Sequence, residues 1–181
     1  SHFVIVDGAG NVVSMTTTVE FAFGSHQMAA GMVLNNQLTA FSFLPVRDGK
    51  PVANAVAPGK RPRSSMTPAI VFDSDGDVWA AAGSPGGPAI IGYVAKTLIA
   101  MIDWGMTTQE AVNFPNAVYP RGAPLLEEDR FDAQIVEGLK ARGHSELTVR
   151  ALNSGVHAFK RLDDGSFEGG ADLRREGVFL T

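Results

Sequence analysis

The chain lacks cysteine, a long uninterrupted apolar run and a net positive charge. Without cysteine it can form neither a disulfide framework nor a thiolate nucleophile, and the compartment is left open. The longest mostly apolar segment, residues 89–106, contains Lys96 and Asp103, which indicates a buried helix and no membrane partner. The net charge of −4, with one short basic cluster at residues 60–63, argues against a nucleic-acid partner.

The composition that remains is that of an ordinary globular protein. Hydrophobic residues make up 45% and charged residues 19% of the 181 positions. A chain of this length can bury a sizeable core, and we expect a single domain over residues 1–181.

Three segments have the pattern of two strands joined by a tight turn. The turns fall at residues 7–11, 73–77 and 163–166, where Asp and Gly supply the backbone geometry that hairpins need. Residues 12–23 are expected to form one long strand because they contain a β-branched run. Antiparallel sheet is therefore the expected main architecture.

Helices are expected between and after these strands. Pro88 suits the first turn of a helix that runs to about Trp104, a short helix follows a cap at Thr107 or Thr108, and residues 132–142 form a third. Two segments rich in Pro, Gly and charge are expected to be surface loops: residues 43–63 and 114–130. The order predicts an α+β protein with helices packed on one sheet or on two stacked sheets.

The first residue, Ser1, stands directly before a strand-like run. A hydroxyl beside a free α-amine can act as a nucleophile with the amine as its general base, because an unperturbed amine has a pKa of about 8. The alternative is that Ser1 is a capping residue or the result of an arbitrary cut.

A glycine-rich turn, GSPGGP at residues 83–88, lies between an expected strand and the long helix. Adjacent glycines let the backbone approach a substrate, and N–H groups at a helix start can stabilise an oxyanion or bind a carboxylate. The alternative is a simple turn. The pattern GxxxxGK[ST] is missing, so a nucleotide-binding P-loop is excluded.

Two further groups of polar residues have side chains suited to binding. Ser64 and Ser65 offer adjacent hydroxyls that can hold a substrate carboxylate or serve a turn. The histidines at positions 2, 26, 144 and 157 lack metal-ligand spacing, so we expect neither a metal nor a cofactor.

Taken in order, these segments resemble the small (C-terminal) subunit of the γ-glutamyltranspeptidase family, N-terminal-nucleophile hydrolases that cut their own precursor. The motifs that carry the resemblance are SHF at residues 1–3, the segment 12–24, LNNQ at 34–37, RPRSSM at 61–66, GSPGG at 83–87 and ADLRR at 171–175. The resemblance covers nearly the whole chain, and LNNQ, RPxSSM and GSPGG in this order are highly specific.

The resemblance implies a four-layer αββα sandwich with antiparallel sheets, and a partner, the large (N-terminal) subunit of the same precursor. Small subunits of the family begin with Thr, then Thr or Ser, then His and an aromatic residue. In that register Ser1 matches the second residue, so the resemblance places the nucleophilic Thr before Ser1, at a self-cleavage site. Ser1 itself is the fallback nucleophile.

Other roles follow from the resemblance position by position. Thr18 matches the family Thr that positions the nucleophile, and Gly86 and Gly87 match the pair whose N–H groups form the oxyanion hole. Ser64 and Ser65 match the hydroxyls that hold the substrate α-carboxylate, in a pocket that an Arg of the large subunit would complete.

The chain departs from the family where the substrate's α-amino end would bind. Gln37 matches a family contact to this group. However, Glu20 stands where transpeptidases usually have Asn, and Ala40 where they have an Asp that pairs with the α-ammonium. Glu20 can restore the lost negative charge if its side chain points into the pocket. The loop at residues 43–52 is shorter than the lid of lid-bearing members and lacks its tyrosine, which favours larger acceptors or water.

Together with these residues, the resemblance predicts a hydrolase or acyltransferase that acts through an acyl-enzyme, with glutathione or γ-glutamyl amides as the substrate class. One alternative is an acylase of the same fold for glutaryl or cephalosporin-type amides, which need no α-ammonium partner. The other is a catalytically inactive subunit that binds amino-acid conjugates or only its partner.

Overall fold

The computed structural model describes residues 1–120 and 122–180, and the chain divides into two compact units. The first unit comprises residues 1–16 and the chain from residue 65 onward, and the second comprises residues 17–64. The expectation of a single domain stays a prediction.

The first unit is built on a four-stranded antiparallel sheet in the order β13-β12-β8-β7. Its strands are β7 (Ala69–Phe72), β8 (Val78–Gly83), β12 (His157–Arg161) and β13 (Phe167–Ala171). The two hairpin turns contain Gly76 at φ +88° and Gly165 at φ +83°. The two glycines adopt the left-handed backbone that the Asp/Gly pattern predicts for a tight hairpin turn, which confirms both turns.

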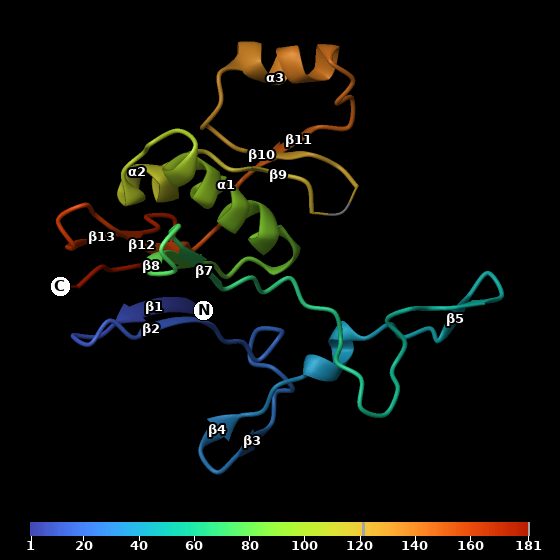
Figure 1. The fold of residues 1–181 in the computed structure, drawn as a ribbon. Coiled ribbons are helices and arrows are strands. Elements are labelled where there is room, and N and C mark those ends of the chain that lie inside the picture. Colours follow the sequence, from blue (N-terminus) through green and yellow to red (C-terminus); the bar gives the residue numbers. More distant parts are fainter. Residues whose placement is uncertain (121, 181) are drawn as a thin grey trace. The chain divides into compact units, whose positions relative to one another are not determined.

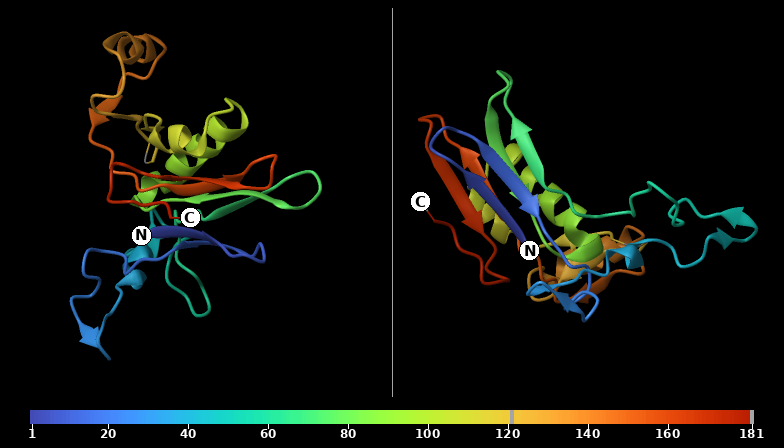
Figure 2. Two further views of the ribbon diagram at one scale, coloured as in Figure 1. Left: turned by 90° about the vertical axis from the view of Figure 1, so that its left-hand side faces the viewer. Right: turned by 90° about the horizontal axis from the view of Figure 1, so that it is seen from below.

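A separate hairpin lies on one face of this sheet, and two helices cover the other face (Figures 1 and 2). The hairpin consists of β1 (His2–Val6) and β2 (Val12–Thr16). The helices are α1 (Ile90–Ile102), which is entered through the 3-10 turn η2 (Gly87–Ala89), and α2 (Thr108–Asn113). These layers confirm the α+β class with antiparallel sheets.

Small residues fill the space between the layers. Ala80, Ala81 and Ala82 of β8 are fully buried, and their short side chains let α1 and the β1–β2 hairpin approach the sheet closely. Tyr93 and Val94 of α1 pack in the main apolar cluster on the helical side.

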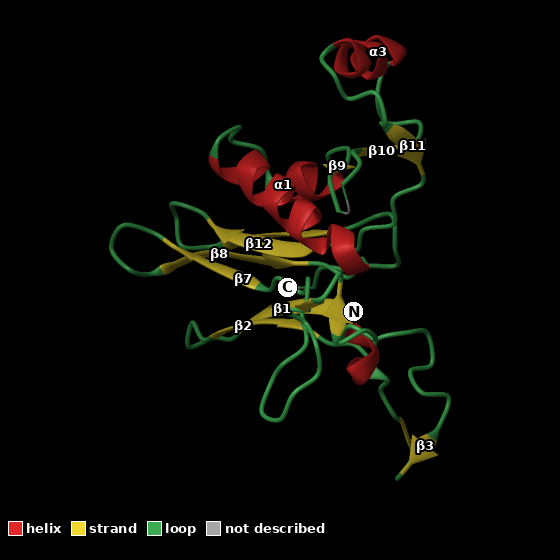
Figure 3. Ribbon diagram, turned by 90° about the vertical axis from the view of Figure 1, so that its right-hand side faces the viewer, coloured by secondary structure: helices red, strands yellow, loops and turns green. Residues whose placement is uncertain are grey.

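Local signals set the helix ends where they were expected. Thr107 caps α2 through a capping box with Glu110, so Thr107 and not Thr108 is the cap. The third helix is α3 (Ala133–Ala141), and none of its residues is buried against the described parts of the chain. Figure 3 shows it beyond a small sheet of β9 (Ala117–Val118), β10 (Leu125–Glu127) and β11 (Thr148–Arg150).

The expectation of one long strand over residues 12–23 is wrong. The strand β2 ends at Thr16, and the second unit begins at the next residue. Glu20 and Phe23 have φ values of +75° and +61°, which an extended strand cannot contain. The Oγ1 atom of Thr18 accepts the N–H of Glu20 at 2.9 Å, so the local side-chain hydrogen bond replaces a strand ladder.

The expectation of a surface loop over residues 114–130 is also wrong. This segment contains β9 and β10, and it buries the polar residues Asn116 and Glu127. Burial is tolerated because the backbone N–H of Asn116 donates to Oε2 of Glu127 at 2.8 Å. Composition alone gave no sign of this pairing.

The second unit has little regular structure. It contains two minimal hairpins and one 3-10 turn: β3 (Met28–Ala29) with β4 (Met32–Val33), β5 (Val46–Arg47) with β6 (Lys50–Pro51), and η1 (Gln37–Ala40). Across both units, no helix of the described residues is long and apolar enough to cross a membrane.

Candidate active site

The glycine-rich loop follows β8 and leads into α1. Gly86 has φ +137° and Gly87 has φ +58°, and Gly87 is the first residue of η2. A residue at a helix start has no intrahelical acceptor for its N–H. Within residues 1–120 and 122–180, neither glycine N–H is donated to a backbone or side-chain acceptor. Two adjacent donors of this kind can stabilise a developing oxyanion.

The ring of Tyr93 packs directly against Gly86. A Cβ atom on Gly86 would lie 2.6 Å from Cε2 of Tyr93, and this ring is 3% exposed. Together with the positive φ, this contact excludes any side chain at position 86 without a shift of the loop.

The strand β1 brings the start of the chain to the same place. His2 is 4% exposed, and its Nδ1 lies 2.8 Å from Oγ1 of Thr16. A Cβ atom on Gly83, the last residue of β8, would lie 2.5 Å from Nε2 of His2. Ser1 and His2 therefore lie beside the strand end from which the glycine-rich loop begins. No spacing in the sequence links these two segments.

The surroundings of His2 favour its neutral form. Burial first, and then the charges of His157 and of the Ser1 amine, together lower the pKa of His2 to about 4. Burial also lowers the pKa of His157. Burial and then the guanidinium of Arg175 lower the pKa of the Ser1 α-amine. Within the described residues, Nε2 of His2 has no hydrogen-bond partner, so the imidazole serves to pack β1 on the sheet.

Acidification is expected to destabilise the protein through His2. The unfolded chain binds a proton at a pKa of about 6.5, whereas the folded chain does so at about 4. The stabilisation is complete above pH 6.5 and is lost as the pH falls from 6.5 to 4, by up to about 3 kcal/mol. Urea unfolding at several pH values measures the slope of the free energy of unfolding against pH. The variant His2→Gln should flatten it, whereas His144→Gln, at an exposed position, should not. An equal slope in both variants would contradict the role of His2.

Three candidate residues of the second unit lie together. The N–H of Glu20 donates to Oγ1 of Thr18 at 2.9 Å, and Nε2 of Gln37 donates to Oε2 of Glu20 at 3.3 Å. The N–H of Gln37 is held by Oδ1 of Asn35 at 2.9 Å. Ala40 ends the η1 turn that Gln37 begins. The structure thus places the Glu20 carboxylate beside Gln37.

The two serines stand at the boundary between the units. Ser64 is the last residue of the second unit and Ser65 the first residue after it, and the carbonyl oxygen of Ser65 accepts the hydroxyl of Thr67 at 2.8 Å. Their assembly with Thr18 and the glycine pair into one pocket stays a prediction, because these residues belong to different units of the chain.

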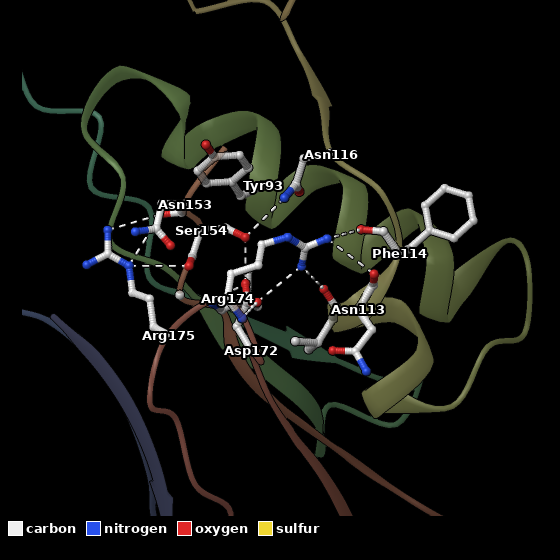
Figure 4. Close-up of polar contacts among 12 residues, drawn as sticks. Tyr93, Asn113, Phe114, Asn116, Asn153, Ser154, Asp172, Arg174 and Arg175 are labelled. Atoms are coloured by element: carbon white, nitrogen blue, oxygen red, sulfur yellow. Dashed lines mark hydrogen bonds and ion pairs between the residues drawn. The ribbon is translucent and has the colours of Figure 1, made fainter. Parts of the chain in front are cut away.

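A buried polar network, which no local sequence pattern indicates, joins segments that lie far apart in the chain (Figure 4). Its centre is Asp172, which is fully buried and accepts hydrogen bonds from Oγ of Ser154 at 2.5 Å and from Nη1 of Arg174 at 3.1 Å. Burial raises the pKa of Asp172, but the hydrogen bonds, that of Ser154 first, bring it below its usual range. The ADLRR motif marks this place in the sequence, although nothing local identifies its partners.

Two cations complete the network. Arg174 forms a two-pronged pair with Glu127, with Nη2 2.8 Å from Oε2, and it also donates to the carbonyl oxygens at the end of α2. Lys96 donates to the carbonyl oxygens of Ala111 and Phe114 at 2.9 and 3.0 Å. Burial, followed by the charge of Arg174, lowers the pKa of Lys96 to about 8. Arg174 thus holds the end of α2 to the segment that follows β13, and Lys96 holds it to α1.

Comparison with known proteins identifies the family to which this chain belongs. The family model described as "Gamma-glutamyltranspeptidase" matches residues 1–181. The "Glutathione hydrolase proenzyme" of Bacillus subtilis (strain 168) is 38% identical over 183 residues, which cover 99% of this chain and 30% of that protein. The chain therefore spans about a third of the length of this curated relative.

Solved structures agree. The Helicobacter pylori gamma-glutamyltranspeptidase T380A mutant is 31% identical with a TM-score of 0.85, covering 96% of this chain and 99% of that one. The cephalosporin acylase from Bacillus halodurans is 26% identical with a TM-score of 0.85, covering 98% of this chain and 33% of that one. The N-terminal-nucleophile hydrolase fold expected from the resemblance is thereby confirmed. The chain belongs to the gamma-glutamyltranspeptidase family.

Proposed function

We propose that this chain is the small catalytic subunit of a γ-glutamyl-type amide hydrolase or acyltransferase. The observation that carries the proposal is the pair of N–H donors at Gly86 and Gly87, beside the strand end on which His2 packs. A relative named glutathione hydrolase supports γ-glutamyl amides such as glutathione as the substrate class.

The proposed reaction is acyl transfer in two steps. The hydroxyl of the nucleophile attacks the amide carbonyl carbon while the α-amine takes its proton, and the N–H groups of Gly86 and Gly87 stabilise the tetrahedral oxyanion. The carbon–nitrogen bond then breaks, and the leaving amine takes the proton. Water or an amine next attacks the ester carbon while the α-amine takes its proton. The ester carbon–oxygen bond then breaks, the nucleophile's oxygen takes that proton back, and the acyl group leaves as an acid or a new amide. The family pattern assigns the nucleophile to a Thr before Ser1, with Ser1 as the fallback, and assigns Thr18 to orienting its hydroxyl.

Recognition of the substrate is proposed to rest on two polar groups. Ser64 and Ser65 bind the α-carboxylate through their hydroxyls. The Glu20 carboxylate, held next to Gln37, pairs with the α-ammonium in place of the Asp that Ala40 replaces. A charge-assisted contact of this kind contributes about 1.5–3 kcal/mol.

The large subunit of the same precursor is the proposed partner. Unusually many large apolar side chains are exposed, among them Phe43 and Leu180 at 84% and Leu173 at 77%. Exposed apolar surface on this scale is typical of a chain that packs against another one. A relative named a proenzyme, of which this chain spans about a third, fits such a precursor.

Paired substrates test the proposal and its main alternative. The full two-subunit protein is expected to hydrolyse a γ-glutamyl anilide in preference to the matching glutaryl anilide, which lacks only the α-ammonium. Glu20→Gln should lower this preference about ten- to a hundredfold in kcat/KM. Ala40→Asp should raise it, because it restores a second negative charge.

The control variant is Asp48→Asn, which makes the same charge change at an exposed turn of the second unit. It should leave the preference unchanged. A preference for the glutaryl anilide in the wild type would instead support a cephalosporin-type acylase, which the similarity to the Bacillus halodurans enzyme makes the second candidate. Binding of both compounds without turnover would identify an inactive binding subunit.

A further inference from the structure

Ser84 lies inside the glycine-rich loop, yet the reaction as proposed gives it no role. It is fully buried. Its Oγ accepts the backbone N–H of Gly155 at 3.2 Å and donates to the carbonyl oxygen of Pro85 at 2.6 Å. One hydroxyl thus bonds both to the next residue of the loop and to Gly155, which lies 71 positions further along the chain.

The segment that contains Gly155 is in turn held by Asp172. Oδ2 of Asp172 accepts the hydroxyl of Ser154 at 2.5 Å and the N–H of Val156 at 3.2 Å. The N–H of Asp172 donates to the carbonyl oxygen of Val156 at 3.0 Å. Both neighbours of Gly155 are therefore fixed, and its N–H is held toward Ser84.

The fit between these segments is also close sterically. A Cβ atom on Gly155 would lie 2.8 Å from Cγ of Pro85 and 2.7 Å from Cδ of Arg175. Arg175 itself donates to the carbonyl oxygens of Asn153 and Ser154 (Figure 4). This segment is therefore packed between the glycine-rich loop and the Arg175 side chain.

The loop needs support because both of its donors are glycines at positive φ. Glycine has the largest conformational freedom to lose, and oxyanion donors act only when they are held in place before the reaction. The Tyr93 ring restrains the loop at Gly86, and the Ser84 hydroxyl restrains it where it leaves β8.

We propose that Ser84 is a positioning residue that fixes the N–H groups of Gly86 and Gly87 through its hydrogen bond with Gly155. The proposal rests on the proposed function, because it gives these N–H groups a role in catalysis. Ser84 touches no substrate and acts only through the geometry of the two donors.

Ser84→Ala in the full two-subunit protein tests this role with two readouts. Hydrogen–deuterium exchange of the peptide covering residues 83–89 is expected to become faster. The kcat for a γ-glutamyl anilide, normalised to the processed fraction, is expected to fall about tenfold, which is about 1.4 kcal/mol in the barrier. The KM should change less than twofold, because the substrate-binding side chains are untouched. Gly155→Ala, which pushes against Pro85, should act in the same direction.

The matched control is Thr108→Val on α2, which removes another fully buried hydroxyl with two hydrogen bonds. It should lower stability without changing the exchange of residues 83–89 or kcat. The proposal is overturned if Ser84→Ala and Thr108→Val have the same exchange in this peptide, or the same kcat. If the wild type turns over no amide substrate, the proposed function fails, and the exchange measurement still decides whether Ser84 holds the loop.

Discussion

Gly86→Ala is expected to lower kcat for a γ-glutamyl anilide by about 10²–10³-fold, the loss typical for one oxyanion donor. The backbone at this position has φ +137°, and the new Cβ would lie 2.6 Å from the buried ring of Tyr93. The loop must move to accept it, and its N–H groups move with it. Steady-state kinetics of the two-subunit protein measures the change, with KM expected to stay within a few fold.

Two other glycines separate backbone strain from loss of the site. Gly76→Ala places a methyl group at φ +88° in the open turn between β7 and β8, where nothing lies within 4 Å, so it should leave kcat unchanged. Gly87→Ala, at φ +58° in open space, should have a smaller effect than Gly86→Ala. Gly87→Pro is a poorer test, because proline requires φ near −65° and would rebuild the backbone as well as remove the donor. Full activity in a folded Gly86→Ala protein would exclude the oxyanion role.

Arg174→Met is expected to lower the free energy of unfolding by about 3–5 kcal/mol. The substitution leaves the carboxylates of Glu127 and Asp172, which are 6% and 0% exposed, without their shared cation. It also removes hydrogen bonds to the carbonyl oxygens at the end of α2. The shift in the midpoint of urea unfolding between variant and wild type measures the loss, provided that the free energy of unfolding falls with urea concentration at the same slope in both.

The control for Arg174 is the exposed pair of Glu137 and Lys140 on α3, whose charged atoms lie 2.9 Å apart. Lys140→Met should change stability by less than about 0.5 kcal/mol, because exposed ion pairs contribute little. Arg174→Lys should be intermediate, since it keeps the charge and loses the two-pronged geometry. A loss below about 1 kcal/mol in Arg174→Met would show that the buried carboxylates find other partners.

The parts of the fold that could be predicted from sequence are those specified by neighbouring residues. The hairpin turns follow from Gly76 and Gly165, and the start of α2 follows from the capping box of Thr107. The end of β2 could not be predicted in this way. The run after Thr16 favours a strand, but Glu20 adopts a left-handed conformation that its residue type does not suggest.

The same division holds for the candidate site. The glycine pair is visible in the sequence, because GSPGG is unusual and precedes an evident helix. Its supports are not visible, since Ser84 depends on Gly155 and Gly155 on Asp172, each far from the next in the chain. Such contacts form only when the folded chain brings distant residues together, so the pattern of neighbouring residues does not reveal them. The resemblance indicated that ADLRR matters without indicating what Asp172 does.

The contact between His2 and Gly83 makes the first strand intolerant of changes in length. Side chains alternate between the two faces of β1, and His2 is the one that fits over the residue without a side chain. Inserting or deleting one residue within β1 would turn the opposite set of side chains toward the sheet and bring Phe3 or its neighbour over Gly83. Substitutions within β1 should thus be far better tolerated than a one-residue shift in the register of the strand. Engineered fusions or truncations near this strand need to preserve the count of residues as well as their chemistry.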